Sequence, residues 1–356
     1  MDDRFRVVIT SSCRSLRGLA LLLCLFVTGC SAHLQKFEYV RLKMGTGFRL
    51  VMYTTDKAKA DRAADAVFAR IDRLNSIFSD YDPQTELSRL GQQTDDGPMS
   101  APVRVSDDLW NIISIARAAS ERSDGAFDIT VGPFVKLWRR SRDMQELPTI
   151  ERIAQTRGSV GWEGIRLFPE THSVQLLKPH MRLDVGGIGK GYTAMQSMAV
   201  LKGFGIRKAM VGAAGDLTVG EPPPGKAYWR VAVQSLADPA KTEGYVKLRN
   251  ASISTSGDTQ RYVIINNQRY SHIINPKTGL GLTDRIGASV ITPDGTTSDW
   301  LCKPPCVLGH EQGLALIDST PRAAGRVVTL DEDGTEHKYE SKRWKDFVLK
   351  EGAGSD

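Results

Sequence analysis

The order of helical and strand-like patterns along the chain limits its fold more than any other feature. Residues 37–54 predict a hairpin that turns near Met44, residues 57–78 have apolar side chains at helical spacing, and Ser106 can cap a helix reaching Ala119. Short β-prone runs dominate the second half, with helical stretches only near residues 149–156, 191–201 and after Pro305. Because helices and strands do not alternate regularly, we expect an α+β fold, with mixed or antiparallel sheets and flanking helices.

Composition sets limits on size and on partners. The chain has 356 residues, of which 41% are hydrophobic, so it can bury a sizeable core in one large domain or in two intimate subdomains. Its formal net charge of +6 is spread along the sequence, without a dense block of Lys and Arg. This distribution argues against a nucleic-acid partner.

The N-terminus has the pattern of an export signal. Basic residues precede an apolar run at residues 19–27, which is too short for a spanning helix, and Thr28 and Gly29 then precede Cys30. We therefore expect a signal peptide at residues 1–29, a tether lipidated at Cys30 over residues 30–36, and a folded body at residues 37–348. The alternative is a secreted or once-anchored protein in which Cys30 is incidental.

The most distinctive motif is LDVGGIGKGY at residues 183–192. It predicts a strand over residues 181–185, a glycine-rich turn and then a helix. Such a turn presents backbone N–H groups and a positive helix end to an anion, and Lys190 adds a charge, so the motif favours phosphate binding. The spacing matches neither the P-loop nor the dinucleotide fingerprint, and an ordinary turn is the alternative interpretation.

Other segments share this glycine-rich, polar character. They read GAFDITVGPF at residues 125–134, GAAGD at 212–216, SISTSGD at 252–258 and YSHIINPKTG at 270–279. With MGT at Met44 and YDP at Tyr81, their order resembles the FAD:protein FMN transferase family, also called the ApbE family, across residues 37–330. The resemblance implies the fold of that family and an exported lipoprotein facing the bacterial periplasm. It also implies FAD binding and Mg²⁺-assisted transfer of FMN to a Ser or Thr of a membrane redox protein, with release of AMP.

The resemblance also implies roles for single residues. His272 is the candidate general base, because imidazole titrates near neutral pH and can take a proton from the acceptor hydroxyl. For each residue taken alone, packing in the core is the alternative. The residues expected to hold FAD are Met44, Tyr81, Ala126, Phe127, Asp128, Asp184, Lys190 and the backbone near Ile273.

The segment that completes the family's Mg²⁺ site is altered here. The family reads roughly ADALAT, whereas residues 298–303 read SDWLCK. The implied ligands are Asp299, which is also a catalytic candidate, the carbonyls of Gly187 and Cys302, and Lys303 in place of a Thr. An ammonium has no lone pair for a cation and repels one at contact distance. Either FAD binds without the metal and transfer is weak or lost, or Mg²⁺ persists on Asp299, carbonyls and water.

The residues around Lys303 raise two further questions. Pro304 is expected to bias Lys303 away from the helical region and to displace the next helix start toward Cys306. Cys302 and Cys306 are the cysteines of the expected body. Their spacing leaves open a local disulfide, two packed thiols, or a metal or redox site.

Overall fold

The computed structural model describes residues 33–238, 240–257 and 262–350. Residues Leu34–Asp356 form one compact unit. The expected signal peptide and Cys30 lie outside the described residues, whereas the last residues of the expected tether already belong to a strand that begins at Gln35. Within the described part of the chain, no helix is both long and apolar enough to cross a membrane.

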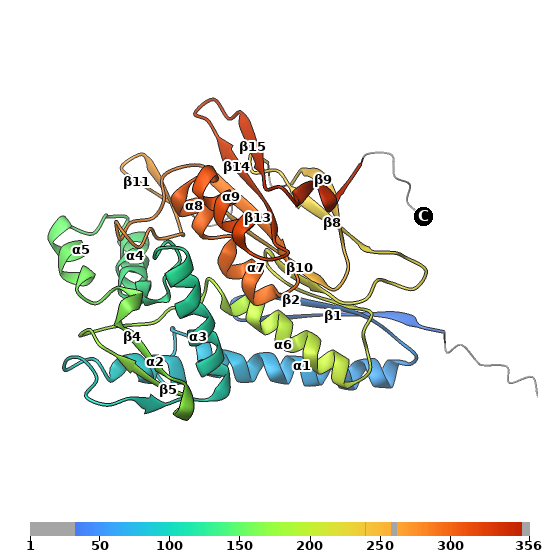
Figure 1. The fold of residues 1–356 in the computed structure, drawn as a ribbon, viewed down its shortest axis with the longest axis horizontal. Helices are drawn as coiled ribbons and strands as arrows, with labels where there is room; N and C mark the ends of the chain where they lie inside the picture. The colour runs from blue at the N-terminus through green and yellow to red at the C-terminus, as the bar shows by residue number, and fades with distance from the viewer. Residues whose placement is uncertain (1–32, 239, 258–261, 351–356) are drawn as a thin grey trace, which may run out of the picture. The chain divides into compact units, whose positions relative to one another are not determined.

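Helices and strands occur largely in the order that the sequence patterns indicate (Figure 1). The expectation of only three helical stretches in the second half is wrong, because residues 295–301 also form a helix. The helices are α1 (Lys57–Phe78), α2 (Glu86–Gln92), α3 (Asp107–Arg122), α4 (Gly132–Met144), α5 (Ile150–Arg157), α6 (Gly189–Gly203), α7 (Gly295–Leu301), α8 (Pro304–Leu308) and α9 (His310–Ser319). The strands are β1 (Gln35–Lys43), β2 (Thr46–Thr54), β3 (Val103–Arg104), β4 (Ile165–Phe168), β5 (Ser173–Leu176), β6 (Ala209–Ala213), β7 (Asp216–Val219), β8 (Trp229–Gln234), β9 (Thr242–Leu248), β10 (Ala251–Gly257), β11 (Tyr262–Ile265), β12 (Gln268–Ser271), β13 (Ile286–Thr292), β14 (Ala324–Leu330), β15 (Glu336–Glu340) and β16 (Val348–Leu349).

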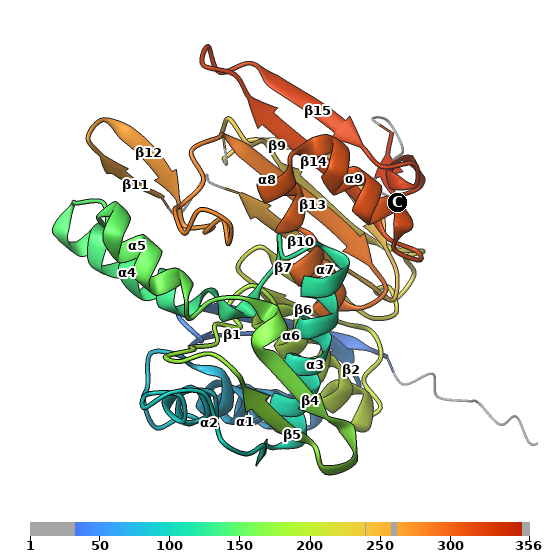
Figure 2. The same cartoon turned by 60° about the vertical axis from the view of Figure 1, so that its left-hand side comes forward.

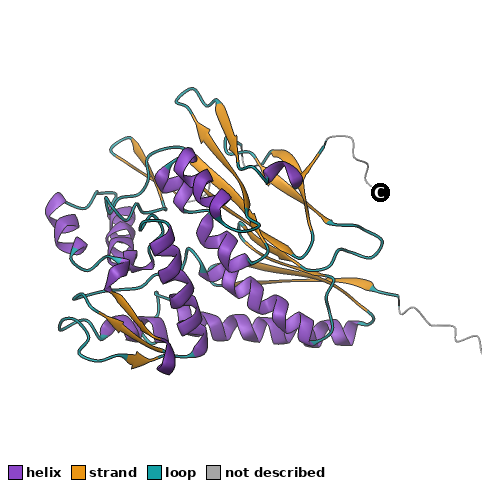
Figure 3. Ribbon diagram, in the orientation of Figure 1, coloured by secondary structure: helices purple, strands orange, loops and turns teal. Residues whose placement is uncertain are grey.

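A large antiparallel sheet organises the body. Among the described residues it has eight strands in the order β1-β2-β6-β7-β10-β13-β14-β15. Helices α1, α6, α7 and α9 pack on one face, and the small sheet β16-β9-β8 packs on the other. Figures 2 and 3 show these layers. The predicted α+β class with antiparallel sheets and flanking helices is confirmed.

Side-chain alternation explains why both faces of the sheet are covered. On β2, Leu50 and Met52 point toward α1 and α6, whereas Val51 packs with Trp229 and Trp344 on the opposite side. All five of these side chains are buried. Because successive residues of a strand face opposite sides of the sheet, an apolar strand such as β2 needs other elements packed on both faces.

The strand register gives the sheet two ends. At the first, which we call the tether edge, β1 begins at Gln35, opposite Thr54, and β10 begins at Ala251. At the second, the site edge, Met44 forms the β1–β2 turn and Asp216 begins β7. The nine residues of β1 separate the two edges by roughly 30 Å at about 3.3 Å per residue.

The predicted strand over residues 181–185 is wrong. Met181, Leu183 and Val185 are buried in alternation, as in a strand, but the segment pairs with no other strand among the described residues. Its backbone instead bonds to loops, and the Asp184 N–H donates to the Ile129 carbonyl at 2.7 Å. The segment is therefore an extended core-packed loop that leads into the glycine-rich turn.

Candidate functional site

The glycine-rich turn brings the start of α6 against α7. The Gly191 N–H donates to Asp299 Oδ2 at 2.8 Å. A Cβ at Gly191 would lie 2.1 Å from the Gly295 carbonyl oxygen and 2.6 Å from Asp299 Cβ. Only glycine permits this approach, so the motif is needed for helix packing as well as for a turn.

Two lysines and two carboxylates meet beside this turn. Lys190 Nζ lies 2.7 Å from Asp216 Oδ2 and 4.0 Å from Asp299 Oδ1. Lys303 Nζ forms an ion pair with Asp299 Oδ1 and donates to the Asp299 backbone carbonyl at 2.6 Å. The side chains of Asp299 and Asp216 are 0% and 4% exposed, whereas those of Lys190 and Lys303 are 26% and 17% exposed. The outward face of this lysine–carboxylate cluster is therefore positive.

Mutual attraction keeps Asp299, Lys190 and Lys303 ionised: like that of Lys303, the pKa of Lys190 is held above its ordinary value, because burial is outweighed by the Asp299 and Asp216 charges. Burial alone raises the pKa of Asp299, but Lys190 and Lys303 outweigh it and hold that pKa below its ordinary value. Burial alone lowers the pKa of Lys303, but the Asp299 carboxylate reverses the shift and holds the pKa above its ordinary range. Both ammonium groups are consequently charged at neutral pH.

The donor atoms around Asp299 do not fit a Mg²⁺ site. One carboxylate oxygen pairs with Lys303 and the other accepts the Gly191 N–H. The Cys302 carbonyl accepts from the Cys306 thiol at 3.6 Å, and a Cβ at Gly187 would lie 3.6 Å from Lys303 Cε. Within the described ranges, no group of three or more His, Cys, Asp or Glu side chains is arranged so that it could hold a metal ion. The Lys303 ammonium thus stands beside Asp299, where a cation would have to bind.

The expected backbone of Lys303 is wrong. Lys303 has helical dihedral angles, φ −86° and ψ −48°, and α8 begins directly at Pro304. The ion pair reaches one turn back from Lys303 to Asp299, which requires a nearly continuous helical path. A proline in the first turn of α8 costs little, because its missing N–H has no helical partner there.

Cys302 and Cys306 are both buried as thiols, not joined in a disulfide. Their environment explains this. The Cys302 thiol donates to the Asp299 carbonyl at 3.1 Å, and burial raises its pKa to about 12. The packed-thiol interpretation is confirmed, and at neutral pH Cys302 carries almost no reactive thiolate.

A second charged group lies at the other end of the glycine-rich turn. Arg139, from α4, pairs with Asp80 at 2.7 Å and lies 3.9 Å from Asp184 Oδ2. Its guanidinium carbon lies 3.9 Å from the centroid of the Tyr81 ring, and Tyr81 is 77% exposed. Burial, and then the Asp80 charge, raise the pKa of Asp184. Tyr81 therefore offers a flat, exposed ring beside the turn, as expected for contact with a planar ligand.

Two other predicted residues also lie close to the turn. A Cβ at Gly187 would lie 3.1 Å from the ring of Phe127, which is buried next to Trp300. Met44, in the β1–β2 turn, accepts a hydrogen bond from the Thr193 hydroxyl at 3.6 Å. The structure therefore brings Phe127 and Lys303 to the same glycine, and it brings Met44 to the first turns of α6.

Three of the residues predicted to hold FAD are buried or hydrogen-bonded within the protein. Ala126 is buried, and Ile273 uses its N–H on Ser271 and its carbonyl on Leu282. The Asp128 carboxylate accepts from the N–H and hydroxyl of Thr130 and from the Trp162 N–H, at 2.8–3.1 Å. For Asp128 and Ile273 the contacts are structural, and roles toward a ligand stay predictions. His272 is exposed in the bend after β12.

Asp128 should make stability depend on pH. Burial raises its pKa from about 3.8 to about 6. Between these pH values the folded chain keeps a proton that the unfolded chain has lost, so the free energy of unfolding falls as pH rises, by roughly 2 kcal/mol for this group. Urea unfolding at pH 4 and pH 7 should show a decline in wild type that is smaller in Asp128→Asn. Equal declines in both proteins would contradict the assignment.

Sequence reasoning gave no role to three charged residues of the site. Asp216 lies within the GAAGD segment, so its motif was visible but its pairing with Lys190 was not. Asp80 precedes the predicted Tyr81, and Arg139 lies in α4 outside any motif. Only the folded chain shows that Arg139 connects Asp80 to Asp184.

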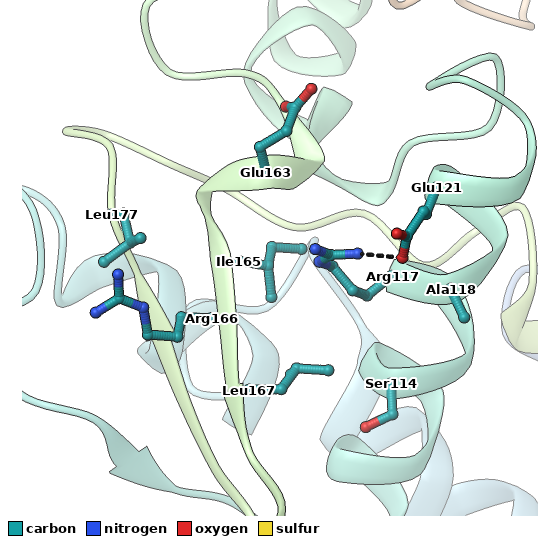
Figure 4. Close-up of a pocket in the computed structure, with 9 residues that line it drawn as sticks. All are labelled: Ser114, Arg117, Ala118, Glu121, Glu163, Ile165, Arg166, Leu167 and Leu177. Atoms are coloured by element: carbon teal, nitrogen blue, oxygen red, sulfur yellow. Dashed lines mark hydrogen bonds and ion pairs between the residues drawn. The ribbon is translucent and has the colours of Figure 1, made fainter.

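A cavity of about 500 Å³ lies elsewhere, between α3 and β4 (Figure 4). Its lining includes Ser114, Leu167 and Arg117, and Arg117 pairs with Glu121 at 3.0 Å. None of the predicted site residues lines it. The size of a cavity is therefore a poor guide to the site in this chain, and the charged side chains at the glycine-rich turn are the better one.

Comparisons with known proteins show which family the chain is similar to. The model of the ApbE family matches residues 44–326. An FAD:protein FMN transferase of Klebsiella pneumoniae is 30% identical over 299 residues, covering 81% of this chain and 83% of the relative, and that of Haemophilus influenzae is 26% identical, covering 88% and 92%. The solved flavin transferase ApbE from Vibrio cholerae is 25% identical, with a TM-score of 0.78, and the match covers 88% of this chain and 99% of that one. By its motifs, its fold and these matches, the chain belongs to the ApbE family.

Proposed function

We propose that this protein binds FAD at the glycine-rich turn and transfers FMN to a hydroxyl of an acceptor redox protein, with release of AMP. The observation that carries the proposal is the positive outward face of the lysine–carboxylate cluster. Lys190 and Lys303 stand at the start of α6 with their counter-charges buried beneath them. Two ammonium groups and a helix N-terminus suit the two negative charges of a pyrophosphate.

The remaining contacts fit the rest of the cofactor. The exposed Tyr81 ring, supported by Arg139, can stack on one of the flat rings of FAD. Asp184 can accept hydrogen bonds from the ligand, because only its Oδ1 is engaged by a backbone N–H, that of Gly186 at 2.7 Å. Tyr81 and the lysines lie at opposite ends of the turn, as an extended dinucleotide requires.

The transfer step follows from phosphoryl chemistry. The acceptor oxygen forms a bond to the flavin-side phosphorus, the bond from that phosphorus to the bridging oxygen breaks, and AMP leaves with that oxygen. The proton of the acceptor hydroxyl passes to His272, which is exposed and so open to a protein substrate. Lys190 and Lys303 neutralise the charge that gathers on the phosphate oxygens.

A direct assay tests this proposal. The body, residues 34–356, is incubated with FAD and an acceptor domain of a membrane redox complex, in EDTA and in Mg²⁺. We expect flavin fluorescence to remain on the denatured acceptor, together with AMP in equal amount. An acceptor variant that lacks its hydroxyl is the control. If the acceptor carries no flavin in either buffer, transfer is excluded.

Binding of FAD without transfer is the second candidate function. It is favoured by the contacts of both Asp299 carboxylate oxygens, one with Lys303 and the other with the Gly191 N–H, and by the Lys303 charge, which repels a catalytic cation. This function predicts tight FAD binding in both buffers and neither flavin on the acceptor nor AMP. AMP without labelled acceptor would instead indicate FAD hydrolysis. Absence of FAD binding would exclude both candidates.

A further inference from the structure

Three arginines gather at the tether edge, at the opposite end of the sheet from the flavin site. They line a cavity of about 280 Å³. Arg249 comes from the β9–β10 turn, Arg322 lies just before β14, and Arg343 follows β15. Asp346 is the single carboxylate among the residues that line this cavity. We call Arg249, Arg322 and Arg343 the arginine pocket.

Within the part of the chain that the structure describes, the three positive charges of the arginine pocket exceed the one negative charge, that of Asp346, that lines the cavity. Among the described residues, none of the three arginines forms an ion pair. Arg343 is held instead by backbone carbonyls, with Nε 2.7 Å from Ala323 O and Nη2 2.8 Å from Asp318 O. Its guanidinium is thus fixed in place while it keeps its full charge. Exposed Lys342 adds further positive charge next to Arg343.

The backbone around Arg322 is also unusual. Arg322 has φ +59°, in the left-handed region that a side chain seldom adopts. Glycine would adopt this conformation without strain, yet the chain has an exposed arginine there. Arg322 lies in a turn and is one of ten non-glycine residues with positive φ among those described, so this conformation places an exposed cation at the pocket and does not by itself indicate a ligand.

The position of the pocket relative to the start of β1 suggests what it contacts. The pocket residue Ala251 begins β10, at the same end of the sheet where β1 begins at Gln35. Cys30 precedes Gln35 by five residues, which can span no more than about 18 Å. A lipid attached at Cys30 would therefore hold the tether edge close to the bilayer.

We propose that the arginine pocket binds the phosphates of anionic lipid headgroups and orients the body with its tether edge on the membrane. The flavin site then faces away from the bilayer, at a height of roughly 30 Å set by the length of β1. At that height it can reach acceptor domains that project from the membrane. The proposal depends on the predicted lipidation of Cys30 and not on the proposed flavin chemistry.

Vesicle binding tests the lipid contact. The body, residues 34–356, forms a compact unit with its own buried core and is used without its lipid anchor. We expect it to co-sediment with vesicles containing phosphatidylglycerol and not with pure phosphatidylcholine. Binding should fall with added salt, because exposed charges are screened.

Matched variants assign the contact to the pocket. The double variant Arg249→Gln/Arg322→Gln should bind phosphatidylglycerol vesicles about thirtyfold more weakly, since each arginine near an anionic surface contributes about 1 kcal/mol. Arg104→Gln/Arg166→Gln removes the same charge from exposed positions on β3 and β4 and should bind like wild type. Equal weakening in both double variants, or no binding of wild type to anionic vesicles, would overturn the proposal. Inorganic phosphate competing at the headgroup concentration would show a site for soluble anions instead.

Discussion

Replacing Lys303 with Met is expected to weaken FAD binding by about tenfold and to lower the free energy of unfolding by about 3 kcal/mol. Asp299 is fully buried, and its Oδ1 pairs directly with the Lys303 ammonium. Methionine fills similar space but leaves that oxygen without its hydrogen bond, and Lys190 lies 4.0 Å from it. A buried carboxylate that loses its partner is costly, because it was removed from water for that pairing. Fluorescence titration of FAD measures the loss of binding, and urea unfolding measures the loss of stability.

A double variant separates the two effects of Lys303. Adding Asp299→Asn to Lys303→Met removes the uncompensated charge, and the amide oxygen can still accept the Gly191 N–H. Most of the stability should return in this protein, whereas FAD binding should stay weak because the ammonium is absent. If the single variant is as stable as wild type and binds FAD equally well, the lysine–carboxylate cluster does not have the role assigned to it.

Replacing His272 with Gln should reduce FMN transfer by about 10²–10⁴-fold while FAD binding is retained. Glutamine keeps hydrogen-bonding capacity but cannot take the proton of the acceptor hydroxyl at neutral pH. The side chain of His272 is exposed, so the substitution should not disturb the core. The measurement is the rate of acceptor labelling at saturating FAD, followed from pH 5.5 to pH 8.

The pH profile distinguishes a base from a structural residue. Wild type should gain activity as an imidazole loses its proton, and the residual rate of His272→Gln should lack that step. Lys277→Gln, an exposed change in the same segment, should leave rate and profile unchanged. If His272→Gln transfers FMN to the acceptor at the wild-type rate, His272 is not the general base.

Local patterns in the sequence predicted local structure well. The helical spacing of residues 57–78 is that of α1, and Ser106 caps α3 by accepting the Leu109 N–H at 3.3 Å. The strand predicted at residues 181–185 is wrong because alternating burial also arises in an extended loop packed on the core. Alternation reports which side chains are buried and not whether the backbone has a partner strand.

The site was predictable only in part. The glycine-rich motif indicated an anion site near Lys190, and the replacement of a Thr by Lys303 indicated a changed metal site. The four-residue spacing of Asp299 and Lys303 also allowed a helical ion pair, provided that the backbone stayed helical up to Pro304. The pairs Lys190–Asp216 and Arg139–Asp184 join segments distant in sequence, so no local pattern predicts them.

Titration of FAD into the wild-type body, once in EDTA and once with Mg²⁺, tests the central claim most directly. The claim is that the Lys190 and Lys303 ammonium groups supply the positive charge that the pyrophosphate needs. It predicts stoichiometric binding with the same affinity in both buffers, and recovery of a Mg²⁺ requirement in Lys303→Thr, which frees an Asp299 oxygen. Binding by the wild type only in the presence of Mg²⁺ would contradict it.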